Sequence, residues 1–421
     1  MPDPDRPQDP ALLSSWKEIA AYLGVNVRTA QNWEVERGLP IRRLPGGRGR
    51  VFISISELDE WLEKRPEVAG APEELPPHRL QPRRWMLALA ALALVCGTAL
   101  AWYLWRRTLM PSEWSVANNS LIVLDDHGRE LWRKRFDFAL TDYAIAQRRL
   151  HDLGAIGDIN SDGQPEVVFL VFPFSPSSPA MVLCFDASGN ELWRFVPGKR
   201  MATPKDVMEP PYTPLGVCLL RTRAGVRIAV SSSHTSEYAT QVALLSPQGK
   251  LLREYWHSGH LQFLRPLQRD GHQLLLAGGI ANGYKQAVLV TLDPETMAGV
   301  SLESNKDYQL AGPPAVEVSR VLFPRSCMNL ARKPFNGVSV INLLPDRFSV
   351  NVREELEEST ASVQHLFDSA GHYLGADMAS DFVGRHRELE TAGILKHALN
   401  EKAETEALNK IVWVAGGPPA R

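Results

Sequence analysis

The sequence is poor in cysteine and nearly neutral in net charge, and each shortage excludes a class of protein. Its 421 residues include four cysteines, of which Cys96 lies inside a long apolar stretch. Cys184, Cys218 and Cys327 are an odd number beyond that stretch and provide no disulfide framework, although one pair could form in an oxidising compartment. We expect buried free thiols instead. The formal net charge of -2 excludes binding to nucleic acid through bulk charge, so any basic surface must be local.

Charge and proline are both absent from residues 85–105, which read WMLALAALALVCGTALAWYLW between two pairs of arginines. A helix of this length covers about 30 Å, which matches one bilayer core. The tryptophans at its two ends suit the two lipid-water interfaces. The stretch therefore predicts a single transmembrane helix, in preference to a buried core helix or a cleaved signal peptide.

The residues before this stretch predict two short helices joined by a tight turn. A capping-box pattern begins the first helix at Ser15, and Gly24 ends it. Asn26 can cap a second helix from Val27 to about Arg37. An arginine-bearing hairpin with a glycine-rich tip follows, and then a helix that begins at Ser56. Two helices joined in this way are typical of the helix-turn-helix, whose second helix enters the major groove of DNA.

Residues 15–62, SWKEIAAYLGVNVRTAQNWEVERGLPIRRLPGGRGRVFISISELDEWL, resemble the excisionase and MerR-type winged helix-turn-helix family. The resemblance implies that the second helix faces the groove and that the hairpin, or wing, reaches phosphates or the minor groove. Arginine suits guanine, and asparagine and glutamine suit adenine. The candidate DNA-binding residues are Arg28, Thr29, Gln31, Asn32, Arg42, Arg43, Arg48 and Arg50. The alternative is an ordinary solvated surface on a protein-interaction module.

A repeated hairpin pattern dominates the residues after the apolar stretch. LDDHGRELW at 124–132 recurs as FDASGNELW at 185–193 and as LSPQGKLL at 245–252, with weaker copies at 292–297 and 367–374. Each copy predicts a strand, a turn with a left-handed glycine and a second strand. Four strands per repeat arranged around a ring predict an all-β propeller.

These repeats resemble the quinoprotein-type propellers, in which the tryptophan of each hairpin docks onto the next blade. The resemblance implies that Trp132 and Trp193 are packing residues. It would also allow a quinone-dependent dehydrogenase, but no residues for that chemistry stand out, and we expect no enzyme. We expect the scattered histidines to be polar surface rather than metal ligands (His234, His257, His260 and His272).

Three expectations concern the C-terminal end of the chain. The acidic run 353–358 is expected to be a solvated edge. Leucines and alanines at helical spacing predict an amphipathic helix from Arg385 to about Lys410. Residues 411–414 predict a strand, which could close the ring by pairing with residues 121–124.

One loop in the first repeat has the pattern of a cation site. Oxygen-bearing residues alternate along it at Asp158, Asn160, Asp162, Gln164 and Glu166. Calcium prefers six to eight oxygen ligands, and this spacing wraps them around one point. The loop lacks the acidic twelfth residue of an EF-hand and resembles the FG-GAP or integrin-type propeller loop, with glutamate where aspartate is usual. We predict a structural calcium ion here, and the alternative is a hairpin without an ion.

Together these features predict a multidomain chain of a small α+β winged helix-turn-helix, one transmembrane helix and an all-β propeller. The predicted boundaries are a disordered lead at 1–13, the DNA-binding domain at 14–65, a proline-rich linker at 66–84, the membrane helix at 85–105 and the propeller at 112–421. We expect a single-pass protein of the bacterial inner (cytoplasmic) membrane with a cytoplasmic N-terminus.

The predicted function is a membrane-anchored transcriptional regulator. Its head would bind double-stranded DNA, as a homodimer because one such domain makes a small footprint. Its extracytoplasmic propeller would sense an unknown ligand or protein partner. The alternative is a membrane-tethered interaction scaffold without DNA binding, and a third possibility is an extracytoplasmic oxidoreductase.

Overall fold

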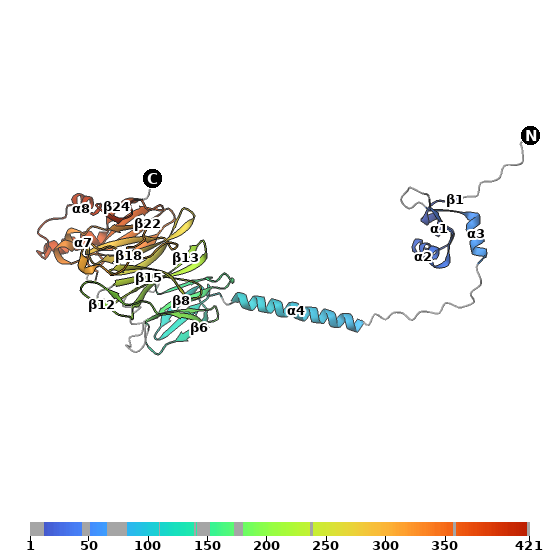
Figure 1. The fold of residues 1–421 in the computed structure, drawn as a ribbon, viewed down its shortest axis with the longest axis horizontal. Coiled ribbons are helices and arrows are strands. Elements are labelled where there is room, and N and C mark those ends of the chain that lie inside the picture. The colour runs from blue at the N-terminus through green and yellow to red at the C-terminus, as the bar shows by residue number, and fades with distance from the viewer. Residues whose placement is uncertain are drawn as a thin grey trace, which may run out of the picture. The chain divides into compact units, whose positions relative to one another are not determined.

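The structure is a computed structural model that forms two compact units, Met1–Leu92 and Ala93–Arg421 (Figure 1). It describes residues 12–43, 51–64, 82–108, 110–138, 140, 152–171, 180–235, 239–356 and 359–418.

The first unit contains the predicted helix-turn-helix. Helix α1 (Trp16–Tyr22) and helix α2 (Val27–Arg37) are joined at Gly24, which has a φ of 66°. Strands β2 (Arg42–Arg43) and β3 (Val51–Ser54) follow, and helix α3 (Ile55–Glu63) comes last. The capping box of α3 uses Ser54 with Glu57, so this helix begins earlier than the predicted Ser56.

A small apolar core holds these elements together. It comprises Ile19, Leu39, Val51, Ile53 and Leu58, with the rings of Trp33 and Trp61 at its edge, 6.2 Å apart. Strand β1 (Leu12–Leu13) pairs with β3, giving the sheet order β1-β3-β2. The predicted disordered lead at 1–13 is therefore wrong for its last two residues, because Leu13 packs against this core.

Helix α4 (Pro82–Thr108) contains the apolar stretch, which is helical as expected. The apolar side chains that the structure describes run from Leu87 to Tyr103, and the large ones are exposed. Within the described residues, no helix is both long and apolar enough to cross a membrane. The prediction of a transmembrane helix at 85–105 is thereby contradicted, and the membrane-anchored arrangement built on it is withdrawn.

The second unit is a series of antiparallel sheets in chain order. The first sheet has β4 (Glu113–Ala117), β5 (Ser120–Leu124) and β6 (Glu130–Arg135). The second has β7 (Gly154–Gly157), β8 (Glu166–Val171), β9 (Met181–Phe185) and β10 (Glu191–Phe195). The third has β13 (Thr213–Thr222), β14 (Gly225–Ser233), β15 (Ala239–Leu245) and β16 (Leu251–Ser258). A two-stranded pair, β11 (Met201–Ala202) and β12 (Val207–Met208), lies between the second and third in sequence.

Two larger sheets complete the series. The fourth has β17 (Leu261–Arg269), β18 (His272–Ala281), β19 (Gln286–Leu292), β20 (Ser319–Leu322) and β25 (Val412–Ala415). The fifth has β21 (Gly337–Leu343), β22 (Arg347–Arg353), β23 (Ser362–Asp368) and β24 (Tyr373–Met378). Short helices accompany them: η2 (Lys306–Tyr308), α6 (Cys327–Arg332), α7 (Ser380–Thr391) and α8 (Glu401–Leu408).

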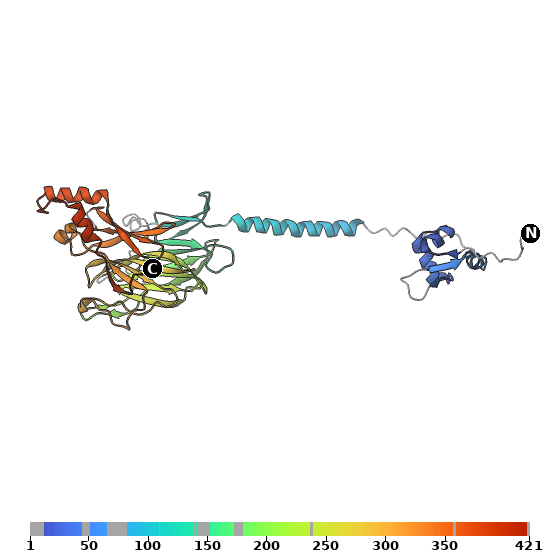
Figure 2. The same ribbon diagram turned by 90° about the horizontal axis from the view of Figure 1, so that it is seen from above.

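Neighbouring sheets in the series pack against each other through apolar faces. One core joins the first three sheets, a second joins the third and fourth, and a third joins the fourth and fifth. The other face of the fifth sheet packs against α6, α7 and α8 through Met328, Phe382, Leu389 and Leu408. These helices occupy the face on which a ring would place the first sheet, and they lie at the opposite end of the unit from it (Figure 1, Figure 2).

The predicted propeller is therefore corrected. The structure contains propeller-like four-stranded sheets, but in the described residues they form an open series rather than a closed ring. The closing strand was also misplaced, because β25 pairs with β20 of the fourth sheet and not with residues 121–124. The predicted helix at 385–410 is two helices, α7 and α8, separated by residues 392–400.

The tryptophans of the first two hairpins dock onto the next hairpin, as the resemblance to quinoprotein-type propellers implied. The indole N–H of Trp132 donates to the carbonyl of Ala187 at 3.1 Å, and its ring covers Gly189. The indole N–H of Trp193 donates to the carbonyl of Pro247 at 2.8 Å, and its ring covers Gly249. The third copy has Arg253 at this position, paired with Leu244 as Trp193 is paired with Cys184, and its side chain is exposed. This tryptophan docking therefore joins the first sheet to the second and the second to the third, and it does not continue to the fourth.

Gly249→Ala should destabilise the second unit more than Gly271→Ala. Both glycines have a left-handed φ, 75° and 79°, so alanine costs about 1–2 kcal/mol of unfolding free energy at either position. A Cβ at Gly249 would lie 2.5 Å from the Trp193 ring, whereas nothing lies within 4 Å at Gly271. Overpacking adds about 1–3 kcal/mol at Gly249 alone. Urea unfolding of the full chain measures the difference, and equal losses would contradict the docking role.

Candidate nucleic-acid interface

Helix α2 presents one polar face that is open to solvent. Arg28, Gln31 and Asn32 are exposed and lie on neighbouring turns of this face. Val35 continues the face and is 84% exposed. Ala30, on the opposite face, is fully buried in the core. The predicted base-contacting positions 28, 31 and 32 are thus available together, on the second helix of a helix-turn-helix.

The start of α2 is fixed by a side-chain cap. Asn26 Oδ1 accepts the backbone N–H of Thr29 at 2.9 Å and the Thr29 hydroxyl at 3.0 Å. Such a cap satisfies backbone donors that would otherwise lack partners at the helix end. Thr29, predicted to contact DNA, is half-buried and already uses its hydroxyl in this cap.

The two arginines of β2 are each paired with a carboxylate. Arg43 donates to both oxygens of Glu34, at 2.5 and 2.8 Å, and Arg42 donates to Glu57. The hydrogen bonds to Glu34 raise the pKa of Arg43 above its ordinary value. Each pair offsets the positive charge that the sequence assigned to this region, which leaves Arg28 as the cation on the open face of α2. Arg48 and Arg50, predicted for the wing, lie outside the described residues.

The predicted calcium loop satisfies most of its own oxygens. Asp158 accepts the backbone N–H groups of Ser161 at 2.7 Å and Gly163 at 3.0 Å. Asp162 accepts the N–H of Gln164 at 2.7 Å. These hydrogen bonds hold the turn from within the loop.

Glu166 lies at the inner end of the same loop. It is buried, and its carboxylate accepts the N–H of Ile159 at 2.9 Å and the side-chain amide of Asn160 at 2.7 Å. Burial raises its pKa, the Ile159 hydrogen bond opposes this, and the charges of Asp162 and Asp158 raise it further. A cation would relieve this repulsion, so the calcium site stays a prediction.

Several polar groups that the sequence placed on the surface are buried. His257 hydrogen-bonds with Ser301 Oγ at 3.0 Å and with the carbonyl of Ile280 at 3.1 Å, and burial lowers its pKa to about 3. Arg320 lies close by, between Glu303 and Glu317. The predicted solvated edge at 353–358 is also wrong in part, because Glu354 and Glu355 are fully buried.

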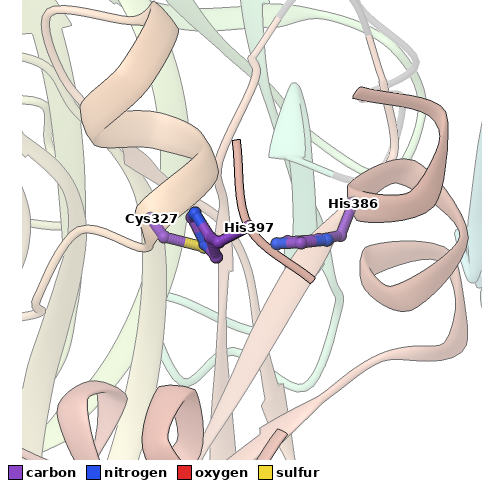
Figure 3. A group of neighbouring side chains, drawn as sticks. All are labelled: Cys327, His386 and His397. Carbon is purple, nitrogen blue, oxygen red and sulfur yellow. The ribbon is translucent and has the colours of Figure 1, made fainter. Parts of the chain in front are cut away.

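Two close groups of metal-ligand side chains occur in the described residues, and neither includes the 158–166 loop. One is Asp125, Asp126 and His127, and the other is Cys327, His386 and His397 (Figure 3). The second group was missed from sequence because four strands separate His386 from Cys327 along the chain, so no short spacing motif marks it.

The fold and the open face of α2 define this unit as a helix-turn-helix domain. Comparison with protein families agrees, since residues 15–66 match the model described as a helix-turn-helix domain. Comparison with curated proteins finds no match.

Comparison with solved structures finds propeller-like neighbours of low similarity. The Dos1 propeller is 11% identical with a TM-score of 0.37, covering 63% of this chain and 56% of that one. The C-terminal domain of PilY1 from Pseudomonas aeruginosa is 12% identical with a TM-score of 0.34, covering 61% of this chain and 58% of that one. A eukaryotic initiation factor is 8% identical with a TM-score of 0.30, covering 64% and 62%. The chain spans less than two thirds of each neighbour, and TM-scores this low transfer no property to it.

If the 158–166 loop binds calcium, millimolar calcium should raise the melting temperature of the full chain, and Asp162→Asn should abolish the rise. Asparagine keeps an acceptor for the N–H of Gln164 but removes one charge from the predicted ligand set. Asp126→Asn, in the other acidic group, is the matched control and should keep the rise. No rise in the unaltered protein, or an equal rise in Asp162→Asn, would exclude calcium at this loop.

Proposed function

We propose that this protein is a transcriptional regulator that binds double-stranded DNA through helix α2. The observation that carries the proposal is the open face of Arg28, Gln31 and Asn32 on a capped second helix. Arginine can bond to guanine, and the two amides can bond to adenine, through the edges that the major groove exposes. The match to the helix-turn-helix family supports the same partner.

We further propose that two copies bind together and that the propeller-like unit binds the ligand or protein that controls them. One helix-turn-helix reads only a half-site, so specific binding is achieved by pairing two heads. The second unit is much larger than the helix-turn-helix unit. A ligand that binds the second unit and favours the paired form of the protein would raise the affinity for DNA, because it increases the population of paired helix-turn-helix units.

A second candidate function is a protein-interaction module without DNA binding. Two observations favour it: the pairing of Arg42 and Arg43 with carboxylates, and the exposure of Val35 on the same face as Arg28. An apolar residue on an exposed helix face suits a protein partner as well as a thymine methyl group. The two functions differ in one requirement. DNA binding needs positive charge on the helix-turn-helix unit, and binding to a protein partner does not.

The deciding experiment captures crosslinked DNA from cells that express the full-length protein. Arg28→Ala, Gln31→Ala and Asn32→Ala are combined in one variant, because these exposed side chains form no hydrogen bonds within the described structure. Each lost base contact costs about 1–3 kcal/mol, so we expect discrete enriched sites to vanish in the variant. Lys64→Ala, at the residue that follows α3, removes an exposed charge outside α2 and should keep these sites. Equal enrichment in both variants, or none in the unaltered protein, would favour the interaction module.

Glu34→Gln should strengthen DNA binding, because it releases the guanidinium of Arg43. One further phosphate contact steepens the dependence of log K on log salt by about 0.9. Glu36→Gln is the control, since it makes the same change in net charge next to the site but releases no arginine in the described residues. Titrating a captured duplex over a range of salt gives both slopes. Identical slopes for the two variants would exclude a role for Arg43.

A further inference from the structure

Three metal-ligand side chains from separate elements converge at the C-terminal end of the second unit. Cys327 begins α6, His386 lies in the middle of α7, and His397 lies in the segment between α7 and α8. Their ligand atoms all lie within 4.8 Å of one another, and Figure 3 shows the three side chains together beside the end of α6.

His386 has an unusual environment for a structural histidine. Its side chain is 0% exposed, yet neither ring nitrogen has a hydrogen-bond partner in the part of the chain that the structure describes. Its Nδ1 lies 3.9 Å from a carboxylate oxygen of Glu390, which is beyond hydrogen-bonding distance. Leaving a buried polar atom unsatisfied costs about 1–3 kcal/mol. A bound cation would give this imidazole the partner that the protein itself does not provide.

A carboxylate stands next to the thiol of the group. Glu404 of α8 accepts the backbone N–H of Cys327 at 2.8 Å. Burial, and then the charge of Glu404 and its hydrogen bond with the thiol, raise the pKa of Cys327 to about 12. Burial and the neighbouring His397 lower the pKa of His386, which favours its neutral imidazole. Neutral imidazole is the form that binds metals, and a divalent cation would displace the thiol proton and offset the charge of Glu404.

The residues that precede two of the ligands are fixed by adjacent buried carboxylates. Ser326, before Cys327, donates its backbone N–H at 3.0 Å and its hydroxyl at 2.8 Å to Glu354. Arg385, before His386, donates its Nε–H to Glu355 at 2.7 Å, and Arg332 of α6 donates to the same carboxylate. Glu354 and Glu355 thus hold α6 and α7 in register with each other. Supporting contacts of this kind orient ligands before a metal arrives.

We propose that Cys327, His386 and His397 bind a zinc ion, with Glu404 as the fourth ligand. Zinc favours tetrahedral sites made of thiolate, imidazole and carboxylate, at about 2.3 Å from sulfur and about 2.0–2.2 Å from nitrogen or oxygen. The ligand atoms must therefore approach one another more closely than they do here. His397 can make this movement because it is exposed and lies outside any helix. With four protein ligands the site is closed, and its role is to fasten α7, α8 and the intervening segment to α6.

The test uses the full-length chain, stripped of metal by a chelator and titrated with zinc or cobalt. We expect one zinc ion per chain and a higher melting temperature with zinc. Bound cobalt should show a sulfur-to-metal charge-transfer band and the strong visible bands of a tetrahedral site. Cys327→Ser should remove the charge-transfer band, whereas Cys96→Ser, an exposed cysteine in α4, should keep it.

A second variant keeps the test valid if Cys327→Ser fails to fold. His397→Ala removes an exposed ligand, so the fold should persist without metal while zinc affinity falls by more than about 10-fold. Absence of stoichiometric zinc binding, an octahedral cobalt spectrum, or unchanged affinity in His397→Ala would each overturn the proposal. Zinc-dependent melting and DNA capture are separate measurements, so this proposal can fail while the DNA-binding proposal stands.

Discussion

The second unit depends on one contact that is made twice: an indole ring from one sheet lies flat on a glycine turn of the next. The turn must be left-handed to present its carbonyl to the indole N–H, and only glycine leaves room for the ring above it. The second hairpin carries both Gly189, which receives the first ring, and Trp193, which reaches the following copy. Sheets built this way stack in chain order, which is why the first three share one apolar core.

This local logic explains what the sequence could predict and where prediction failed. The blade-like hairpins follow from residues within nine positions of one another, and the docking of Trp132 and Trp193 was implied by the resemblance to quinoprotein-type propellers. Ring closure depends on contacts between the first and last sheets, and no local pattern encodes those. Helices α7 and α8 cover the fifth sheet instead, and β25 joins the fourth. The sequence showed the amphipathic pattern of these two helices, but it did not show which face of which sheet they would cover.

In the helix-turn-helix unit, too, features set by residues close in sequence could be predicted, and contacts between distant residues could not. Its caps, its helices and the open face of α2 could be predicted, because each is decided by residues three or four apart. The pairing of Arg43 with Glu34 and of Arg42 with Glu57 could not, since it joins residues from different elements. Counting arginines therefore overstated the positive charge available to DNA, and polar groups on α2 carry more of the proposed recognition than the sequence implied.

The buried carboxylates at the C-terminal end of the second unit are explained by the donors that surround them. Removing a carboxylate from water is costly unless donors surround it. Glu354 and Glu355 both meet this condition through Ser326, Asn336, Arg332 and Arg385. The histidine that these contacts position does not, because both nitrogens of His386 lack partners. A region that satisfies two buried carboxylates so fully, and leaves the imidazole of His386 near Cys327 unsatisfied within the described residues, fits the proposed cation site.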